Sequence, residues 1–348
     1  MEQYGGKVFH PKQSLNTARR FIINTKNNLI DGYNLRRVIN KNGAVIGRYP
    51  LNVQIETVST CNGKCQFCPY QGSWGQINPG KMSWKTYERI IQGLKNYKIG
   101  VFCPYLNNEP LTDIELFDKI EYAVKRLDIK RIEISTNLSL LNNVNLSRMK
   151  KLLPTIPHEL WISFHGVSRE TYEDIMGLNF DKTISNVMSV IELLQDTPLN
   201  IVIKGAGIPK NNSKDYKHWF SSEDYHSFWK KQLCQFKKKP KIYYFQYHDR
   251  AGSKQLTNKG LNFDFCRKDL NRFYCIRFDK WAHFLYTGEL ILCCMDYNRE
   301  TVFDSNINDK TIEEIFASPS FIDMIKKGTG LSSSDKGFIC KRCISPGG

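Results

Sequence analysis

The chain has 348 residues, of which 41% are hydrophobic and 24% charged, as in a soluble globular protein large enough for one barrel-sized domain and a smaller unit. No run approaches the ~18 apolar residues of a membrane span, and the first residues form no apolar signal segment, so we expect a cytoplasmic protein. Eleven cysteines in such a chain indicate metal ligation rather than disulfides, and a net charge of +16 is compatible with an anionic partner.

Strand and helix patterns alternate along most of the chain. Residues 1–50 are mixed and basic, and we interpret them as an N-terminal extension. From residue 51, apolar runs predict strands at Leu51–Val58, Ile99–Leu106, Arg131–Thr136, Glu159–Phe164, Asn200–Gly205 and Lys241–Tyr247. Helices are expected between them, at Trp84–Asn96, Ile114–Leu127, Leu146–Leu152, Asp181–Leu194 and Glu223–Phe236, with Ser83 and Asp113 at N-cap positions. Six such βα units fall short of a closed eight-unit barrel.

A cysteine-rich loop follows the first predicted strand at once. Cys61, Cys65 and Cys68 read C-x3-C-x2-C, and this short spacing lets three thiolates converge on one iron–sulfur cube. A tetrahedral zinc site would need a nearby fourth ligand, yet the next cysteine, Cys103, lies 35 residues further on. We therefore expect a [4Fe-4S] cluster in which one iron lacks a protein ligand and can bind a chelating amino acid.

Polar residues follow the later predicted strands. Barrel enzymes place their chemistry at the carboxyl ends of their strands, so these residues are candidates for the same site. His165 could bind substrate or act in acid–base catalysis, or it could be a buried structural histidine. Burying a lysine inside a barrel strand costs free energy unless its charge is paired, so Lys204 is a further candidate. The candidates are Asn107, Asn108 and Glu109 after the second strand, Ser135 and Asn137 after the third, Ser163 and His165 after the fourth, and Lys204 in the fifth.

The densest basic run is Lys237–Lys241. It could be a solvated loop, or it could face an acidic electron donor such as flavodoxin or ferredoxin, a phosphorylated substrate or nucleic acid. Nucleic acid is the weakest of these partners, because no stretch interleaves aromatic and basic residues in an RNA-binding pattern.

A second group of cysteines lies near the C-terminus. Cys275 and Cys293 read C-x12-G-x4-C around Gly288, and Cys340 and Cys343 close the chain with C-x2-C. The turn Tyr286–Glu289 predicts a hairpin of strands Trp281–Leu285 and Leu290–Cys293, followed by a short helix at Ile312–Phe316. Four thiolates could hold one further iron–sulfur cluster or a structural zinc ion. Cys266 could replace one ligand, whereas Cys294 would point to the opposite face of its strand and is expected to pack, as are Cys103 and Cys234.

The first cysteine loop resembles the radical S-adenosylmethionine (SAM) superfamily, whose signature C-x3-C-x-aromatic-C includes Phe67 here. The resemblance implies an α/β fold with a partial (β/α)6 TIM-like barrel at residues 51–250. It also implies that the open iron chelates SAM and that one electron cleaves it to a 5′-deoxyadenosyl radical, which abstracts a substrate hydrogen. In this family Gly-Gly-Glu-Pro follows the second strand, and here two asparagines replace the glycines. Asparagine tolerates positive φ better than most residues, so the backbone path could survive.

The same resemblance assigns SAM contacts within the barrel. It places the SAM amino group at Asn107, Asn108 and Glu109, and the ribose near Ser135 and Asn137. Ser163 has the corresponding position at the end of the fourth strand, and Lys204 could reach the SAM carboxylate. Phe67 completes the predicted cofactor-binding set.

The C-terminal cysteines resemble the Twitch domain, the shortened form of the SPASM domain, at residues 260–348. The resemblance implies one auxiliary [4Fe-4S] cluster on Cys275, Cys293, Cys340 and Cys343, because only Ile344–Gly348 follow the last of them.

Three functions are compatible with these patterns. The first is oxidation of a small polar substrate, such as an aminocyclitol or sugar, in which the auxiliary cluster accepts the second electron. The Twitch dehydrogenase of butirosin biosynthesis, a natural-product pathway, works on this plan and shares the ligand layout. The second is a maturase that epimerises or cross-links a ribosomal peptide, although 50 residues before the barrel are few for a peptide-recognition domain. A radical sugar epimerase is a further alternative, which would need a thiol or another hydrogen donor.

Overall fold

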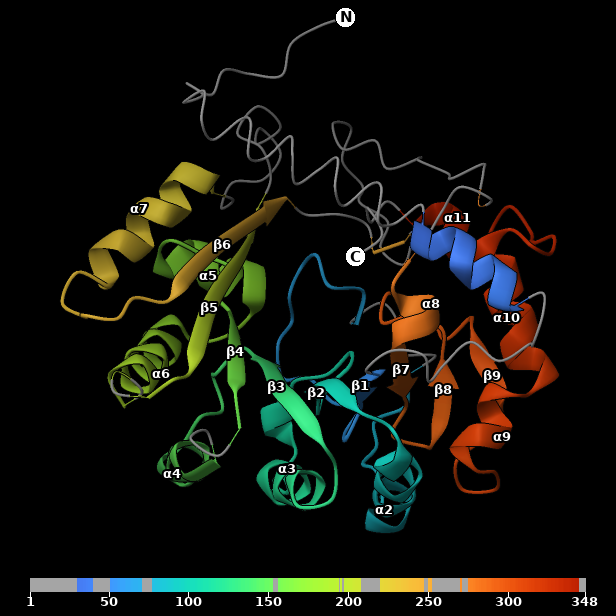
Figure 1. Ribbon diagram of the computed structural model, residues 1–348. Coiled ribbons are helices and arrows are strands. Elements are labelled where there is room, and N and C mark those ends of the chain that lie inside the picture. Colours follow the sequence, from blue (N-terminus) through green and yellow to red (C-terminus); the bar gives the residue numbers. More distant parts are fainter. Residues whose placement is uncertain are drawn as a thin grey trace, which may run out of the picture.

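The computed structural model describes residues 30–39, 51–70, 77–152, 156–193, 195, 197–207, 220–246, 250–251, 270 and 275–343. Within these residues a nine-stranded sheet has the order β6-β5-β4-β3-β2-β1-β7-β8-β9. In Figure 1 the strands form an arc, and helices including α2, α3, α4 and α6 lie along its outer side.

The first six strands are parallel and follow one another in sequence, which confirms the predicted partial barrel. Each residue on β1 that faces the helices is buried, with Val53 and Ile55 at 0% exposure, while Gln54 between them faces the concave side. β1 and β2 end earlier than predicted, because the residues after Ile55 and Cys103 leave the sheet as loops. The strands are β1 (Leu51–Ile55), β2 (Ile99–Cys103), β3 (Ile129–Thr136), β4 (His158–Ser163), β5 (Asn200–Gly207) and β6 (Lys241–Gln246). Tyr247, the end of the last predicted strand, lies outside the described residues.

The connecting helices overlap the predicted ranges, but α3 and α7 are shorter than predicted and α4 begins three residues earlier, at Asn143. Two further corrections concern a cap and a missed helix. Ser83 caps α2 as expected, since its side chain accepts a hydrogen bond from Thr86 N. Asp113 caps no α-helix, because α3 begins only at Leu116, and its carboxylate instead accepts from Glu115 N and pairs with the buried Lys119. The sequence interpretation also missed α5. The helices are α2 (Trp84–Gly93), α3 (Leu116–Val124), α4 (Asn143–Leu152), α5 (Arg169–Met176), α6 (Phe180–Leu193) and α7 (Ser222–Gln232), with short 3-10 turns η2 (Leu94–Asn96) and η3 (Pro110–Thr112).

The C-terminal part extends the same sheet. β7 (Trp281–Phe284) pairs parallel with β1, and β8 (Glu289–Ile291) and β9 (Val302–Asn306) follow as antiparallel strands. Gly288 provides the hairpin turn, with φ of 100° that favours glycine. The predicted strand to Cys293 is too long, because β8 ends at Ile291 and the cysteines occupy a turn. The helices here are α8 (Arg277–Lys280), α9 (Ile312–Phe316), α10 (Pro319–Thr329) and α11 (Ile339–Arg342).

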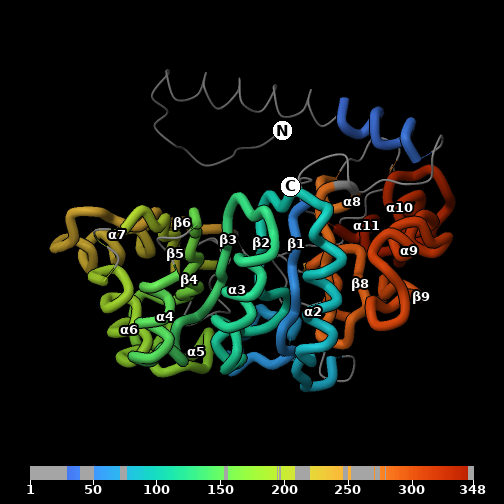
Figure 2. The backbone as a smooth tube through the Cα atoms, turned by 60° about the horizontal axis from the view of Figure 1, so that its bottom comes forward, coloured from blue at the N-terminus to red at the C-terminus, as the bar shows by residue number. Residues whose placement is uncertain are grey.

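Residues 30–39 form a helix that packs on this C-terminal part (Figure 2). Arg36 Nε donates to Thr329 O at 3.1 Å, and Lys280 forms an ion pair with Asp31 at 3.3 Å. The remainder of the predicted N-terminal extension lies outside the described residues, and the predicted domain boundaries stay a prediction. None of the helices in the described ranges combines the length and apolar character needed to cross a membrane.

Candidate active site

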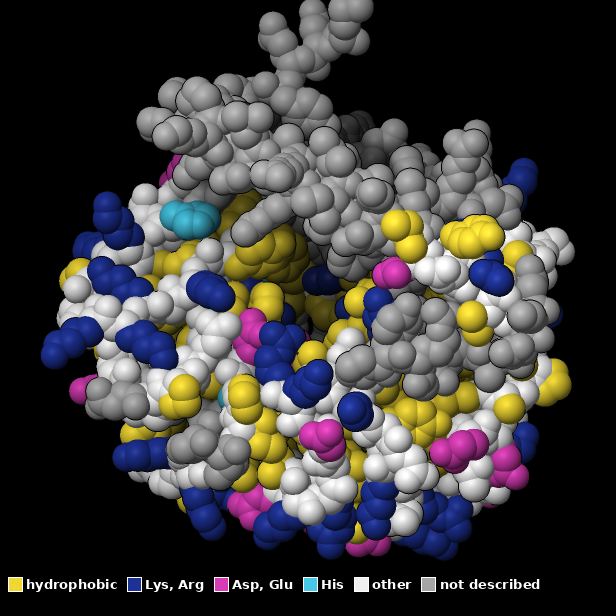
Figure 3. Space-filling model, in the orientation of Figure 1, with side chains coloured by type: hydrophobic (Ala, Val, Ile, Leu, Met, Phe, Trp, Pro, Cys, Tyr) yellow, Lys and Arg dark blue, Asp and Glu magenta, His cyan; other side chains and the backbone are white. Residues whose placement is uncertain are grey.

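A cavity of about 540 Å³ opens on the concave side of the sheet, at the carboxyl ends of its parallel strands. Figure 3 shows the hollow near the middle of this face, with hydrophobic and basic side chains around it. Every barrel residue singled out from the sequence lines this cavity. These are Cys61, Cys65, Phe67, Cys68, Asn107, Asn108, Glu109, Ser135, Asn137, Ser163, His165 and Lys204. The structure brings them together, and their individual roles stay predictions.

The cysteine loop is held by the carboxyl end of helix α5. Lys64 N donates to Met176 O and Gln66 N donates to Ile175 O, both at 2.9 Å. The last carbonyls of a helix have no intrahelical partner, so these two loop amides satisfy groups that would otherwise need water. Gly177 ends α5 in the left-handed conformation, with φ of 63°, and lies directly against Lys64.

Three thiols of this loop lie side by side within largely buried surroundings. A Cβ placed on Gly63 would lie 3.5 Å from Cys65 Sγ and 3.7 Å from Cys61 Sγ. Burial, Glu109 and Cys68 raise the pKa of Cys61 to about 12, and burial together with the neighbouring sulfurs raises that of Cys65 well above its ordinary value. Thiolates in this position need a cation to stabilise them, so the donor set fits a metal–thiolate cluster, whose binding releases protons.

Glu109 connects the loop after β2 to the end of β3. Its carboxylate accepts hydrogen bonds from Asn137 N at 2.7 Å, Leu111 N at 3.1 Å and the Thr136 hydroxyl. Burial raises its pKa to about 7, although these three donors oppose the shift. Glu109 N also donates to Thr60 O at 3.0 Å, just before the cysteine loop. The glutamate therefore fixes the relative positions of three strand ends.

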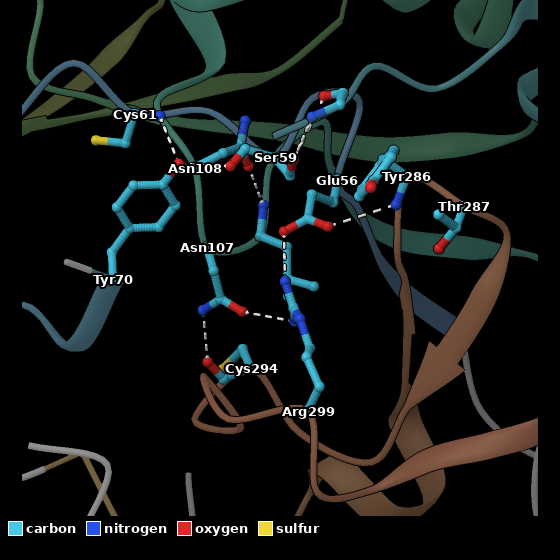
Figure 4. A network of polar contacts seen from close by, with 12 residues as sticks. Glu56, Ser59, Cys61, Tyr70, Asn107, Asn108, Tyr286, Thr287, Cys294 and Arg299 are labelled. Atoms are coloured by element: carbon cyan, nitrogen blue, oxygen red, sulfur yellow. Dashed lines mark hydrogen bonds and ion pairs between the residues drawn. The ribbon is translucent and has the colours of Figure 1, made fainter. Parts of the chain in front are cut away.

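Asn107 extends this framework to the C-terminal part (Figure 4). Its Nδ2 donates to Cys294 O at 2.9 Å, and its Oδ1 accepts from Arg299 Nη1 at 3.0 Å. Arg299 also forms a 2.6 Å ion pair with Glu56, which follows β1 and is 1% exposed. A glycine could make neither side-chain contact, so this asparagine joins the barrel motif to the auxiliary part. The sequence suggested that asparagine is accepted here because it tolerates positive φ. That explanation is not needed, because neither Asn107 nor Asn108 has positive φ.

Asn137 and its neighbours connect β3 to the cysteine loop. Asn137 Nδ2 donates to Asn62 Oδ1 at 3.0 Å, and Asn62 Nδ2 donates to Ser139 Oγ at 2.8 Å. Ser139 Oγ in turn donates to Asn137 Oδ1 at 2.7 Å, which closes a ring of three side chains. The side chain of Asn137 is thus committed to positioning the loop.

His165 is held as a neutral imidazole. Its Nδ1 accepts a hydrogen bond from Ala206 N at 2.8 Å, so the ring proton resides on Nε2. Burial, together with the charges of Lys204 and Arg250, lowers its pKa to about 3. The ring also meets Phe67 edge to face, with centroids 4.8 Å apart. These contacts are those of a structural histidine, although the ring borders the cavity.

Lys204 carries a positive charge close to the predicted SAM contacts. Its Nζ donates to Ser135 Oγ at 2.8 Å and lies 5.5 Å from the centre of the Trp161 ring. Burial and Arg250 lower its pKa to about 8, so the ammonium form persists at neutral pH.

Three of the four predicted auxiliary cysteines lie near one another: Cys275 precedes α8, Cys293 follows β8 and Cys343 follows α11, whereas Cys340 lies within α11. The sulfur of Cys275 interacts electrostatically with those of Cys343 and Cys293. Cys340 is buried, at 6% exposure. No group of three His, Cys, Asp or Glu side chains in the described ranges is close enough to hold a single metal ion. Cys266 lies outside the described residues.

Two expectations for other cysteines need correction. Cys294 does not lie on the far face of a strand, because β8 has already ended. It faces the cavity that holds the first cysteine loop and also contacts the small cluster of Leu106, Leu285 and Ile291. Cys234 is exposed rather than buried, whereas Cys103 is buried as expected.

Several cavity residues were missed. They face inward because strand residues alternate, and that alternation was the available signal for those on strands. Loop and helix contributors such as Arg277 and Tyr297 had no comparable signal. The missed lining residues include Gln54, Glu133, Trp161, Tyr243, Phe245, Arg250, Arg277, Trp281 and Tyr297.

Two family models match the chain, the radical SAM superfamily over residues 55–221 and the iron-sulfur cluster-binding SPASM domain over residues 275–344. The chain belongs to the radical SAM superfamily and carries a SPASM or Twitch auxiliary domain. These domains imply a [4Fe-4S] cluster with bound SAM and an auxiliary iron–sulfur cluster, which the two groups of cysteines fit.

Solved structures of the same fold include BtrN in complex with AdoMet and 2-DOIA. It is 16% identical, with a TM-score of 0.54 over 86% of this chain and 95% of that one. Streptococcus suis SuiB bound to its precursor peptide SuiA is 15% identical, with a TM-score of 0.52 over 93% of this chain and 73% of that one. The structure of anSMEcpe with bound AdoMet is 17% identical, with a TM-score of 0.55 over 81% of each chain. No curated protein matches the sequence.

Proposed function

We propose that this radical SAM enzyme dehydrogenates a small polar substrate, such as an aminocyclitol or sugar, and passes the second electron to its auxiliary cluster. One observation carries the proposal: Cys294, next to the predicted auxiliary ligand Cys293, lines the same cavity as Cys61, Cys65 and Cys68. A substrate in this cavity would therefore lie between the two groups of cysteines. A cavity of about 540 Å³ is within the range of small-molecule sites.

The bound cofactors would supply the chemistry, namely reductive cleavage of SAM, abstraction of a substrate hydrogen atom and acceptance of the electron left on the substrate radical, whose second hydrogen leaves as a proton to solvent. The residues of this chain would bind and orient. Asn107, Asn108, Glu109, Ser135, Asn137, Ser163 and Lys204 are proposed to shape the SAM side of the cavity. Trp161, Tyr243 and Phe245 would form an apolar wall for the substrate, with Trp161 and Tyr243 in edge contact at 6.4 Å.

We also propose an acidic flavodoxin or ferredoxin as the electron donor, approaching near the exposed Lys64 of the cysteine loop. The Lys237–Lys241 run does not support this docking. It leads into the amino end of β6, whereas the cavity lies at the carboxyl ends. Lys238 Nζ there donates to Thr197 O and Leu199 O, at 2.6 and 2.9 Å, and joins two loops.

A peptide maturase is the second candidate, because structures of two similar proteins, SuiB and anSMEcpe, contain bound peptides. Mass spectrometry of reactions run in D2O separates the possibilities. A small-molecule dehydrogenase would remove two hydrogen atoms from its substrate, and the product would contain no carbon-bound deuterium. An epimerase would leave the formula unchanged and incorporate one deuterium, and a cross-linking maturase would remove two hydrogens from a peptide. Either of the last two outcomes would replace the proposed reaction.

A further inference from the structure

Arg277 lines the cavity and interacts electrostatically with the auxiliary cysteines Cys275 and Cys293. It is the first residue of α8, two positions after Cys275, and its side chain lines the cavity. The guanidinium carbon lies 4.1 Å from the centre of the ring of Trp281, another cavity residue, so a cation–π contact holds the positive charge in place. No sequence pattern assigned a role to this arginine.

The charge of Arg277 has no carboxylate partner among the described residues. None of the ion pairs found there includes it, and its buried Nη1 has no hydrogen-bond partner. A buried cation without a partner is expensive, and proteins usually pair it or place it beside an anionic group. By contrast, Lys204 donates to Ser135 and Arg299 pairs with Glu56.

The groups that can compensate Arg277 are sulfurs. Arg277 lies close enough to the sulfurs of Cys294, Cys293 and Cys275 to interact with them electrostatically, and Cys294 lines the same cavity. Cys275 and Cys293 are two of the expected auxiliary ligands. When those sulfurs are metal-bound thiolates, the guanidinium is the cation placed beside them.

We propose that Arg277 is a positioning residue that raises the reduction potential of the auxiliary cluster by holding a positive charge without a carboxylate partner beside the expected ligands, at the wall of the substrate cavity. Reduction adds one negative charge to the cluster, so a fixed neighbouring cation favours the reduced form. The benefit of a raised potential rests on the proposed dehydrogenation, because a cluster at higher potential is a better acceptor for a substrate electron. The effect of Arg277 on the potential does not depend on which reaction the enzyme catalyses.

The test is a reductive titration, followed by electron paramagnetic resonance, of the full chain in which Cys61, Cys65 and Cys68 are replaced by alanine. Only the auxiliary cluster then contributes signal, and neither substrate nor SAM is needed. R277Q should move its midpoint potential to more negative values, with a change of about tenfold in the reduction equilibrium, roughly 59 mV for one electron. R277K, which keeps the charge, should move it less, and R148Q, which removes a surface arginine paired with Asp118, should leave it unchanged.

An unchanged midpoint in R277Q with its iron retained would overturn the proposal, as would an equal shift in R277K. If R277Q loses its iron, W281L provides the second test, since it keeps the charge but removes the ring that holds it. W281L should shift the midpoint in the same direction by a smaller amount, and no shift would also overturn the proposal. Because the titration measures no turnover, a different reaction found by mass spectrometry would leave its result standing.

Discussion

The amide of Asn107 donates a 2.9 Å hydrogen bond to the backbone oxygen of Cys294, 187 residues later in the chain. The contact joins the loop that is expected to bind the SAM amino group to the turn that carries Cys293, an expected auxiliary ligand. The same side chain accepts from Arg299, so its loss would leave a buried carbonyl and a guanidinium N–H without these partners.

Asn107→Gly should therefore lower the free energy of unfolding by about 1–3 kcal/mol, since two partly buried groups, the Cys294 carbonyl and the Arg299 guanidinium, lose a bond. Asn108→Gly is the matched control, because within the described ranges the side-chain oxygen of Asn108 accepts only from Leu106 N, in its own turn, at 2.9 Å. Both substitutions add similar backbone entropy to the unfolded chain. Chemical denaturation under anaerobic conditions measures the difference, and equal stabilities of the two variants would contradict the coupling.

Gly177→Ala should disturb the cysteine loop. A Cβ there would lie 2.9 Å from Lys64 Cβ, and the left-handed φ of 63° adds strain of about 1 kcal/mol or more for a non-glycine residue. We expect lower iron content and less SAM cleavage. Gly330→Ala controls for the backbone strain, because Gly330 ends α10 with φ of 75° and lies in the C-terminal part. If both variants retain the same iron, α5 does not hold the loop as described.

Lys204→Met should change how stability depends on pH. The folded-state pKa of Lys204 is lowered to about 8, while the unfolded value is about 10.4. Below pH 8 both states hold the proton; between these values the folded state releases it and the unfolded chain keeps it, so this lysine adds stability as pH rises. The parent should thus gain stability relative to the variant between pH 7 and 9.5, by no more than about 2 kcal/mol. A difference that is flat with pH, measured by denaturation at both values, would show that the ammonium is not desolvated.

Much of the site could be predicted because parallel strands end at one edge of a sheet. That rule, applied to six short apolar runs, brings Cys61, Glu109, Asn137 and Lys204 into one cavity although they are far apart in the chain. The strands themselves could be predicted, because their residues that face the helices are uniformly apolar.

The missed features depend on tertiary placement or on weak local signals. Helix α5 is short, and its capping box at Ser168 and terminal Gly177 were the signals that could have found it. The inward position of Cys294 follows from where β8 ends, which strand alternation cannot specify. In the sequence Arg277 is an ordinary basic residue. Only its packing on Trp281 and its proximity to the cysteines in the folded chain indicate a role for its charge.

The central claim is that Cys61, Cys65 and Cys68 hold the cluster that cleaves SAM, while the C-terminal cysteines hold a separate one. The most direct measurement compares the parent with the C61A/C65A/C68A variant for iron, acid-labile sulfide and 5′-deoxyadenosine formed from SAM under a strong reductant. We expect about eight iron per parent chain and about four in the variant, with 5′-deoxyadenosine formed only by the parent. SAM cleavage by the variant, or complete loss of its iron while the chain stays folded, would contradict it.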